Sequence, residues 1–268
     1  MISLSNGSET LFIPLYGKAR MSKEKKIISD KKAEEIIDSI DYDFKKLKVA
    51  KKIQVFMSLR AAIIDDFTKG FIDENPGCIV LHLGCGLDSR VLRVKRKAKR
   101  WYDLDFPEVI KIKKQFYKET INYRMIGSSV TDYSWIDKID YDDEPVLVIA
   151  EGLLMYLNED EVEELLIQLK NKFTNAEIIF DAFSKTTVKY SKYQPSLGKT
   201  EAKIQWGSDG PHEIEKYASG ITHIDTKYLN DDYRVKFLNS YYRLMFNITK
   251  FFKSAREAQR IFIFELRS

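Results

Sequence analysis

Cysteine and histidine are scarce in this chain, which excludes several classes of protein at once. Its 268 residues include two cysteines, Cys78 and Cys85, and three histidines. Both cysteines lie in or beside one predicted strand, so we expect them to be reduced rather than paired, as in a cytoplasmic protein. No group of His, Cys and Asp has the spacing of metal ligands, so we expect no metal site.

Long apolar runs and a strong excess of one charge are also missing. No run of about 18 apolar residues occurs and no basic, apolar leader opens the chain, so we expect neither a membrane partner nor secretion. The formal net charge of +4 is too small to predict a nucleic-acid partner. Basic residues do concentrate in residues 90–100, which we expect to form a solvated helix or loop face. The content of hydrophobic residues, 44%, is typical of a globular protein, and the length of 268 residues is that of an enzyme.

The glycines after one apolar run suggest a cofactor site. Residues 79–83 are apolar except for His82, and Gly84-Cys85-Gly86 follows them. Two glycines let the backbone turn sharply and approach a ligand closely. A dinucleotide fingerprint needs a third glycine three residues later, where Ser89 stands, and no Gly-x-x-x-x-Gly-Lys-Ser/Thr occurs. The pattern therefore favours S-adenosylmethionine, which has no phosphate, over NAD.

Two acids follow at the distance that a ribose contact requires. Asp103 and Asp105 lie about 20 residues after the glycines, at the end of the next predicted strand. A carboxylate there can accept both hydrogen bonds of a ribose diol. This acidic partner makes the glycine pattern more specific than it is alone.

The remaining pattern predicts an α/β fold with a doubly wound, mostly parallel sheet and helices on both faces. Predicted strands are residues 78–83, 100–104, 124–126, 146–150, 177–182 and 260–266, with helices over 33–40, 49–67, 107–120, 159–172 and 234–252. An apolar segment over 9–19 is interrupted by Pro14. We expect an N-terminal helical segment (1–75) that covers the cofactor site. A Rossmann-like domain (76–268) follows, with a lid insertion at about 185–222.

Four blocks carry a family resemblance. They are ETLFIPLYGKA (9–19), LGCGLDSR (83–90), DLDFPEVI (103–110) and AEGLLMYL (150–157). In this order they resemble the leucine carboxyl methyltransferase family, and within it the bacterial branch with tetracenomycin-type polyketide O-methyltransferases. The resemblance implies a Rossmann-like sheet of seven strands with an antiparallel last strand. It also implies an S-adenosylmethionine cofactor and O-methylation, often of a carboxylate.

The resemblance also implies residue roles. Arg60 matches the arginine that holds the cofactor carboxylate, for which a planar two-pronged cation is suited. Gly84 matches the glycine whose backbone lies against the cofactor, and Gly86 completes that turn. Asp105 matches the acid that accepts the ribose hydroxyls, and Asp103 is the competing candidate on the same strand face.

Further matches lie after the third and fourth strands. Ser129 and Val130 fall in the loop that meets the adenine; the family often has an acid there, and this chain has Ser129 with Asp132 three residues on. Glu151 matches an acid beside the methionyl part of the cofactor. Tyr156 is a candidate for the catalytic pocket, with a packed core tyrosine as the alternative.

Several polar residues receive no role. We expect Lys18 to be exposed and Tyr16 to be packed. His82 lies inside the first strand and is expected to be structural, while His212 and His223 flank the expected lid. No histidine has a spacing that marks a general base, and a carboxylate acceptor would need none because it is ionised at neutral pH.

The sequence therefore predicts an S-adenosylmethionine-dependent O-methyltransferase that acts on a carboxyl or hydroxyl group of a small, polyketide-like molecule. One alternative within the same chemistry is carboxyl methylation of a protein C-terminus. Alternatives of another class are a non-catalytic cofactor-binding protein and an NAD-binding oxidoreductase.

Overall fold

The computed structural model describes residues 9–191 and 203–268, so residues 1–8 of the N-terminal segment and 192–202 of the expected lid lie outside the described residues. The strands are β1 (Ile79–Leu83), β2 (Arg100–Asp105), β3 (Tyr123–Gly127), β4 (Val146–Ala150), β5 (Ala176–Phe183), β6 (Ile221–Tyr228) and β7 (Gln259–Leu266). The longer helices are α1 (Glu9–Lys23), α2 (Lys31–Ser39), α3 (Lys51–Glu74), α5 (Pro107–Lys113), α6 (Glu159–Lys172), α7 (Lys185–Ser191) and α9 (Ser240–Thr249). Short turns of helix are η2 (Phe44–Leu47), α4 (Arg90–Arg93), η3 (Tyr133–Lys138), η4 (Leu154–Tyr156), α8 (Pro211–Ile214), η5 (Leu229–Asp231), η6 (Tyr233–Phe237) and α10 (Lys253–Arg256).

The strands form one sheet of seven in the order β3-β2-β1-β4-β5-β7-β6. The first five pair in parallel, and β7 pairs antiparallel with both β5 and β6. This confirms the predicted Rossmann-like sheet. Because the order reverses between β1 and β4, the carboxyl ends of β1, β2 and β4 open into one crevice.

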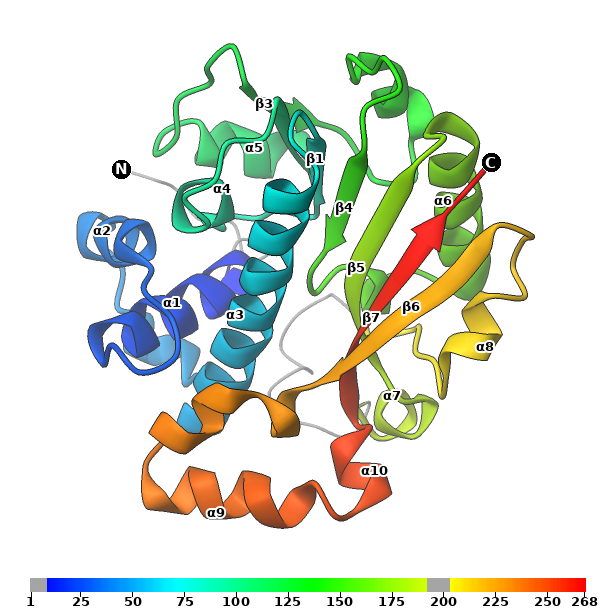
Figure 1. The fold of residues 1–268 in the computed structure, drawn as a ribbon. Helices are drawn as coiled ribbons and strands as arrows, with labels where there is room; N and C mark the ends of the chain where they lie inside the picture. The colour runs from blue at the N-terminus through cyan, green and yellow to red at the C-terminus, as the bar shows by residue number, and fades with distance from the viewer. Residues whose placement is uncertain (1–8, 192–202) are drawn as a thin grey trace.

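Both faces of the sheet are covered. Alternate residues of β1 join different apolar clusters: Val80 packs with α3 side chains such as Leu59, and Leu81 packs with α6 side chains such as Leu166. Figure 1 shows α1 and α3 on one side of the sheet and α6 on the other. A strand covered on both faces is continuously apolar, and all five residues of β4 are buried.

Several predicted bounds are wrong. The helix expected over 107–120 ends at Lys113, and the one expected over 234–252 breaks at Leu238 between η6 and α9. Helix α1 continues through Pro14, where an interruption was expected. The end of the expected lid, residues 221–222, belongs to β6. The sequence did not predict this edge strand because five of its eight residues are polar. Among the described residues, no helix is both long and apolar enough to cross a membrane.

Candidate active site at the carboxyl end of the sheet

The turn after β1 is held by two glycines in the left-handed region. Gly84 has φ +59° and Gly86 has φ +50°, which only glycine adopts without strain. A Cβ on Gly84 would lie 2.9 Å from Leu153 Cδ1. The Gly86 N–H donates to Asp105 Oδ2 at 2.7 Å, so the turn is tied to the end of β2. One of the two expected cofactor glycines, Gly86, therefore contacts the expected ribose acid.

Replacing Gly84 with alanine should lower the free energy of unfolding by about 1–2 kcal/mol, the usual cost of a left-handed alanine. A matched control is Gly70→Ala inside α3, where nothing lies within 4 Å of the added Cβ. That change should stabilise the protein by about 0.5–1 kcal/mol, because alanine favours a helix interior. Urea unfolding of the two variants measures both effects. Equal destabilisation by both would contradict the argument from φ.

The two candidate ribose acids lie in different surroundings. Asp103 is buried and receives hydrogen bonds from Trp101 Nε1 at 2.8 Å and Tyr123 Oη at 2.7 Å, with Lys113 Nζ 2.8 Å from its Oδ2. Burial opposes ionisation of Asp103, but Lys113 and His82 hold its pKa below the usual range. Its oxygens thus serve the interior of the fold.

Asp105, two residues later, reaches the crevice. Its carboxylate accepts from the backbone N–H groups of Gly86 and Phe106, at 2.7 and 2.8 Å. Burial raises the pKa of Asp105, and these two N–H groups oppose that rise. Each oxygen of an ionised carboxylate accepts more than one hydrogen bond, so Asp105 keeps capacity for hydroxyl donors.

The loop after β3 lies beside Asp105. Ser128 N–H donates to the Asp105 carbonyl at 2.9 Å, and Val130 is buried. Ser129 Oγ lies 2.8 Å from Thr131 Oγ1. Asp132 accepts from Ser134 N–H as the cap of η3, so its carboxylate stabilises the loop. The structure thus brings Ser129 and Val130 to the same edge as Asp105.

A second group of charges lies at the ends of β4 and β5. Arg60 of α3 donates from Nε to Glu151 at 3.1 Å and from Nη1 to Asp181 at 2.8 Å. Asp181 also accepts from Gly152 N–H at 2.6 Å. Burial alone would raise the pKa of Glu151, but Arg60 and Arg90 lower it to about 2. The arrangement keeps Glu151 ionised and aims the Arg60 guanidinium across the β4 turn.

The basic run 90–100 is not the solvated face that the sequence predicted. Arg90 is completely buried and pairs with Glu151 and Asp65. The side chain of Arg93 is buried as well and bonds to Asp65, with Nε at 2.5 Å, and to Asp30, with Nη1 at 2.8 Å. The prediction of a solvated face is correct for the later part of the run, where Arg96 is exposed.

Lys18 of α1 is also buried, where the sequence predicted an exposed side chain. It pairs with Asp88 in the turn after Gly86. Burial opposes ionisation of Asp88, but Arg93, Lys18 and Arg90 hold its pKa well below the usual range. A charged network therefore links the N-terminal helices to the cofactor turn. Tyr16 is packed as expected, with its ring stacked on Phe44.

Tyr156 ends η4 and packs beside the charged group. It lies against a small apolar cluster of Met155, Val188 and Ile204, and burial raises its pKa. The Gln205 and Trp206 N–H groups both donate to the Met155 carbonyl, at 2.8 and 3.2 Å. Residues 205 and 206 of the expected lid therefore contact η4.

The three histidines lie on three different elements. His82 is buried in β1, with Nε2 3.2 Å from Arg90 Nη1 and Nδ1 3.5 Å from Asp103 Oδ1. His223 Nε2 lies 2.8 Å from Thr226 Oγ1 on edge strand β6, and His212 belongs to α8. These positions support the structural interpretation of His82.

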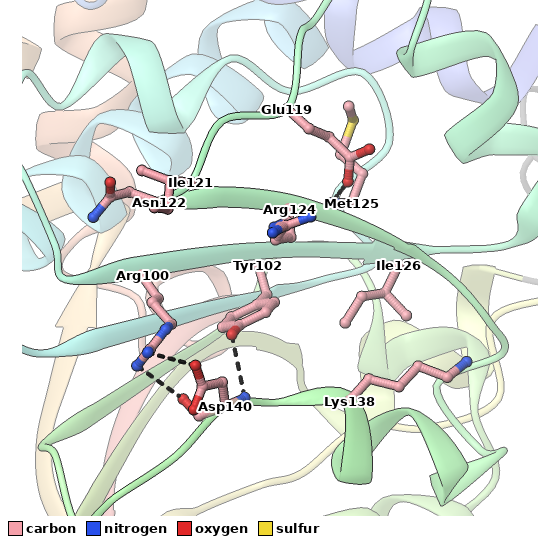
Figure 2. A pocket seen from close by; sticks show the side chains of 10 residues that line it. All are labelled: Arg100, Tyr102, Glu119, Ile121, Asn122, Arg124, Met125, Ile126, Lys138 and Asp140. Carbon is pink, nitrogen blue, oxygen red and sulfur yellow. Dashed lines mark hydrogen bonds and ion pairs between the residues drawn. The ribbon is translucent and has the colours of Figure 1, made fainter.

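A hollow of about 570 Å³ lies elsewhere, over β2 and β3 beside η3 (Figure 2). Arg100, Tyr102, Arg124 and Lys138 line it, and the Asp140 N–H donates to Tyr102 Oη at 3.2 Å. None of the predicted site residues lines this hollow. The candidate site is therefore defined by the converging strand ends rather than by this hollow.

Sequence reasoning missed two acids of the candidate site. Asp181 is buried in β5 and shares Arg60 with Glu151. The sequence does contain a signal for Asp181, because a lone carboxylate in an apolar strand must be paired or solvated. Asp88 also anchors the turn, but nothing local distinguishes it from an ordinary turn residue.

The comparisons with known proteins give the family. The leucine carboxyl methyltransferase family model matches residues 14–170, which is more than half of the chain. This chain belongs to the leucine carboxyl methyltransferase family. The match includes the β1 turn, the Asp105 strand end and the Glu151 turn, so the predicted resemblance is confirmed. This protein is an enzyme, an S-adenosylmethionine-dependent O-methyltransferase.

Two relatives are similar to this chain over most of its length. Tetracenomycin polyketide synthesis O-methyltransferase TcmP of Streptomyces glaucescens is 36% identical over 222 residues, 82% of each chain. The S-adenosyl-L-methionine-dependent methyltransferase dpfgK of Gibberella zeae is 30% identical, over 87% of this chain and 85% of its own. Among solved structures, a putative methyltransferase from Thermobifida fusca has a TM-score of 0.61 at 13% identity, with 84% and 87% covered. That likeness supports the fold.

The residues present fit S-adenosylmethionine. The turn at Gly84 and Gly86 allows close backbone approach, and the Asp105 carboxylate has hydrogen-bonding capacity for hydroxyl groups. Arg60 offers a guanidinium for a carboxylate. Ser89, where a dinucleotide site needs its third glycine, is buried and bonds to Asp30, so it provides no close approach to a pyrophosphate.

Proposed function

We propose that this enzyme methylates a carboxylate of a small, apolar metabolite in the cytoplasm. The relative TcmP is an O-methyltransferase of tetracenomycin polyketide synthesis, which supports a small-molecule acceptor. So does the apolar cluster around Tyr156, formed with Met155, Val188 and Ile204. The buried, unpaired Cys78 and Cys85 agree with a reducing compartment.

The proposal of a carboxylate acceptor, rather than a phenol, rests on the lack of a good general base among Asp88, Glu151 and His82. Asp88 and Glu151 are poor bases because neighbouring cations lower their pKa values. Burial lowers the pKa of His82, which is confined between Arg90 and Asp103. A phenol with a pKa of about 10 needs a base within hydrogen-bond reach, whereas a carboxylate is already ionised. The described site therefore suits an acceptor that arrives as an anion.

Residue roles follow from the positions. Asp105 accepts the ribose hydroxyls, and Ser129 and Val130 border the adenine. Arg60, held by Glu151 and Asp181, binds the cofactor carboxylate, while Tyr156 lines the acceptor pocket. The bound cofactor supplies an electrophilic methyl group on a sulfonium. The chain contributes alignment and exclusion of water, which suffice for a nucleophile that needs no base.

The described N-terminal helices support the proposed domain organisation. Lys18 and Arg93 join residues 9–75 to the cofactor turn through Asp88 and Asp30. We assign this segment to the cover of the cofactor site. Within the expected lid at 185–222, residues 203–208 border the acceptor pocket through Gln205 and Trp206.

Arg60→Lys should weaken binding of S-adenosylhomocysteine about tenfold and leave adenosine binding unchanged. Lysine keeps the charge but loses the planar fork that spans two carboxylates, each charge-assisted bond being worth about 1.5–3 kcal/mol. Calorimetric titration with both ligands measures the difference. A parallel loss for both ligands would refute a clamp on the cofactor carboxylate.

The acceptor class can be tested by the product bond. The enzyme is incubated with methyl-labelled S-adenosylmethionine and a panel of paired aromatic acids and phenols of equal size. A methyl ester releases volatile methanol in alkali, whereas a methyl ether keeps its label. We expect alkali-labile label on acids. Label that resists alkali would contradict the proposal, and label on a peptide with a free C-terminal leucine alone would identify a protein acceptor. Cofactor binding without turnover on any acceptor would favour a non-catalytic protein.

A further inference from the structure

The segment from Tyr233 to Phe252 exposes a row of large apolar side chains. We call it the aromatic stripe; Phe251 is 79% and Tyr241 70% exposed. Within α9, the members Tyr241, Leu244 and Ile248 have helical spacing and share one side. The full stripe consists of Tyr233, Phe237, Tyr241, Leu244, Ile248, Phe251 and Phe252. Monomeric proteins seldom expose a contiguous apolar patch of this kind unless it binds something.

The stripe is distinct from the face by which α9 joins the protein. Phe246 is buried, and its ring lies 5.0 Å from that of Phe56 on α3. Asn230 Nδ2 donates to Thr249 Oγ1 at 2.7 Å on the same side of the helix. Helix α9 therefore has its own buried face, and the stripe is a second apolar face turned outward. Figure 1 shows α9 at the margin of the molecule, at the end toward which β4 runs.

Charge within the segment that carries the stripe has a single sign. Residues 233–256 contain six basic residues and no acidic one. Arg234 and Arg256 pair with acids outside this stretch. The other four are exposed and make no ion pair within residues 9–191 and 203–268; they are Lys236, Arg243, Lys250 and Lys253. The outward side of the segment is thus apolar and cationic together.

The combination of apolar and cationic side chains favours one binding partner over another. A second copy of the chain on a two-fold axis would place the same cations against each other, which opposes association. An anionic bilayer offers apolar depth for aromatic and leucine side chains and phosphate for lysine and arginine. We propose that η6, α9 and α10 form a peripheral docking surface for anionic lipid membranes. The expectation of no membrane partner rested on the lack of a spanning segment, and peripheral docking requires none. The docking does not depend on the proposed acceptor.

Vesicle flotation tests the proposal with the complete protein. We expect recovery with vesicles of phosphatidylcholine and phosphatidylglycerol, much less with phosphatidylcholine alone, and a loss of recovery as salt is raised. Leu244→Glu/Ile248→Glu should abolish flotation. Ile121→Glu, which changes another exposed apolar side chain before β3, should leave it unchanged. Neutralising Arg243, Lys250 and Lys253 to glutamine should weaken binding about 100-fold, at roughly fivefold for each charge.

A spectroscopic arm reports on the same surface. Phe251→Trp should show a blue-shifted emission with the anionic vesicles, because the indole enters an apolar layer. Each variant should keep the wild-type affinity for S-adenosylhomocysteine, which shows that it is folded. Equal flotation with neutral vesicles, or none with either, would overturn the proposal. A dimer in light scattering that Leu244→Glu disperses would instead identify a contact between copies, and binding only to an acidic protein would also contradict a lipid partner.

Discussion

Arg93→Met should lower the free energy of unfolding by about 3–5 kcal/mol, the cost of leaving buried charges without their partner. The Arg93 guanidinium neutralises Asp30, Asp65 and Asp88, all of them buried. Burial opposes ionisation of Asp65 and Asp88, but the neighbouring arginines hold the pKa of both carboxyls below the usual range. In a chain of this size the loss corresponds to a melting temperature lower by about 10 °C. Thermal unfolding at neutral pH measures it.

The basic run supplies a matched control. Arg96 lies three residues beyond Arg93, in the loop after α4, and is exposed, as is its partner Asp73. Exposed ion pairs contribute little because water and salt screen them. Arg96→Met should therefore leave the melting temperature unchanged. If the two variants unfold alike, the buried network does not hold the N-terminal helices to the cofactor turn.

Asp105→Ala should weaken S-adenosylhomocysteine binding by about 1.5–3 kcal/mol, which is roughly 10- to 150-fold. The change removes the charged acceptor proposed for the ribose hydroxyls. It also frees the Gly86 and Phe106 N–H groups that Asp105 now binds. Calorimetric titration of the folded variant measures the loss. An unchanged affinity would remove Asp105 from the cofactor site.

Asp103→Asn is the control on the same strand, two residues away. Asp103 faces Lys113, His82 and Tyr123 in the interior, so its loss should lower the melting temperature and leave the affinity unchanged. The two acids thus predict opposite results in two assays. A large affinity loss for Asp103→Asn at a temperature where it is folded would contradict the assignment to Asp105.

Elements with strong local signals were predictable from the sequence. Helix α6 begins and ends where expected, because Asn158 and Glu161 form a capping box and apolar residues recur at helical spacing. Strand β4 also matches, since a fully buried strand is continuously apolar. The sharp turn at Gly84 and Gly86 was predictable too, because an apolar strand that runs into Gly-x-Gly is a local signal.

Buried charges were not predictable in this way. Arg93 finds Asp30 63 residues earlier in the chain, and Lys18 finds Asp88 70 residues later. A run of basic residues gives no local sign of which members enter the interior, so Arg90 and Arg93 were assigned to a solvated face. Edge strand β6 was missed because a strand that pairs only with β7 has less need of an apolar pattern.

The most direct test of the account is a calorimetric titration of the wild-type protein with S-adenosylmethionine and S-adenosylhomocysteine, with NAD as the matched control. The account predicts micromolar binding of both sulfur compounds at one site per chain and no heat with NAD. A preference for NAD, or no binding of either sulfur compound, would contradict a methyltransferase site at the carboxyl ends of β1, β2 and β4.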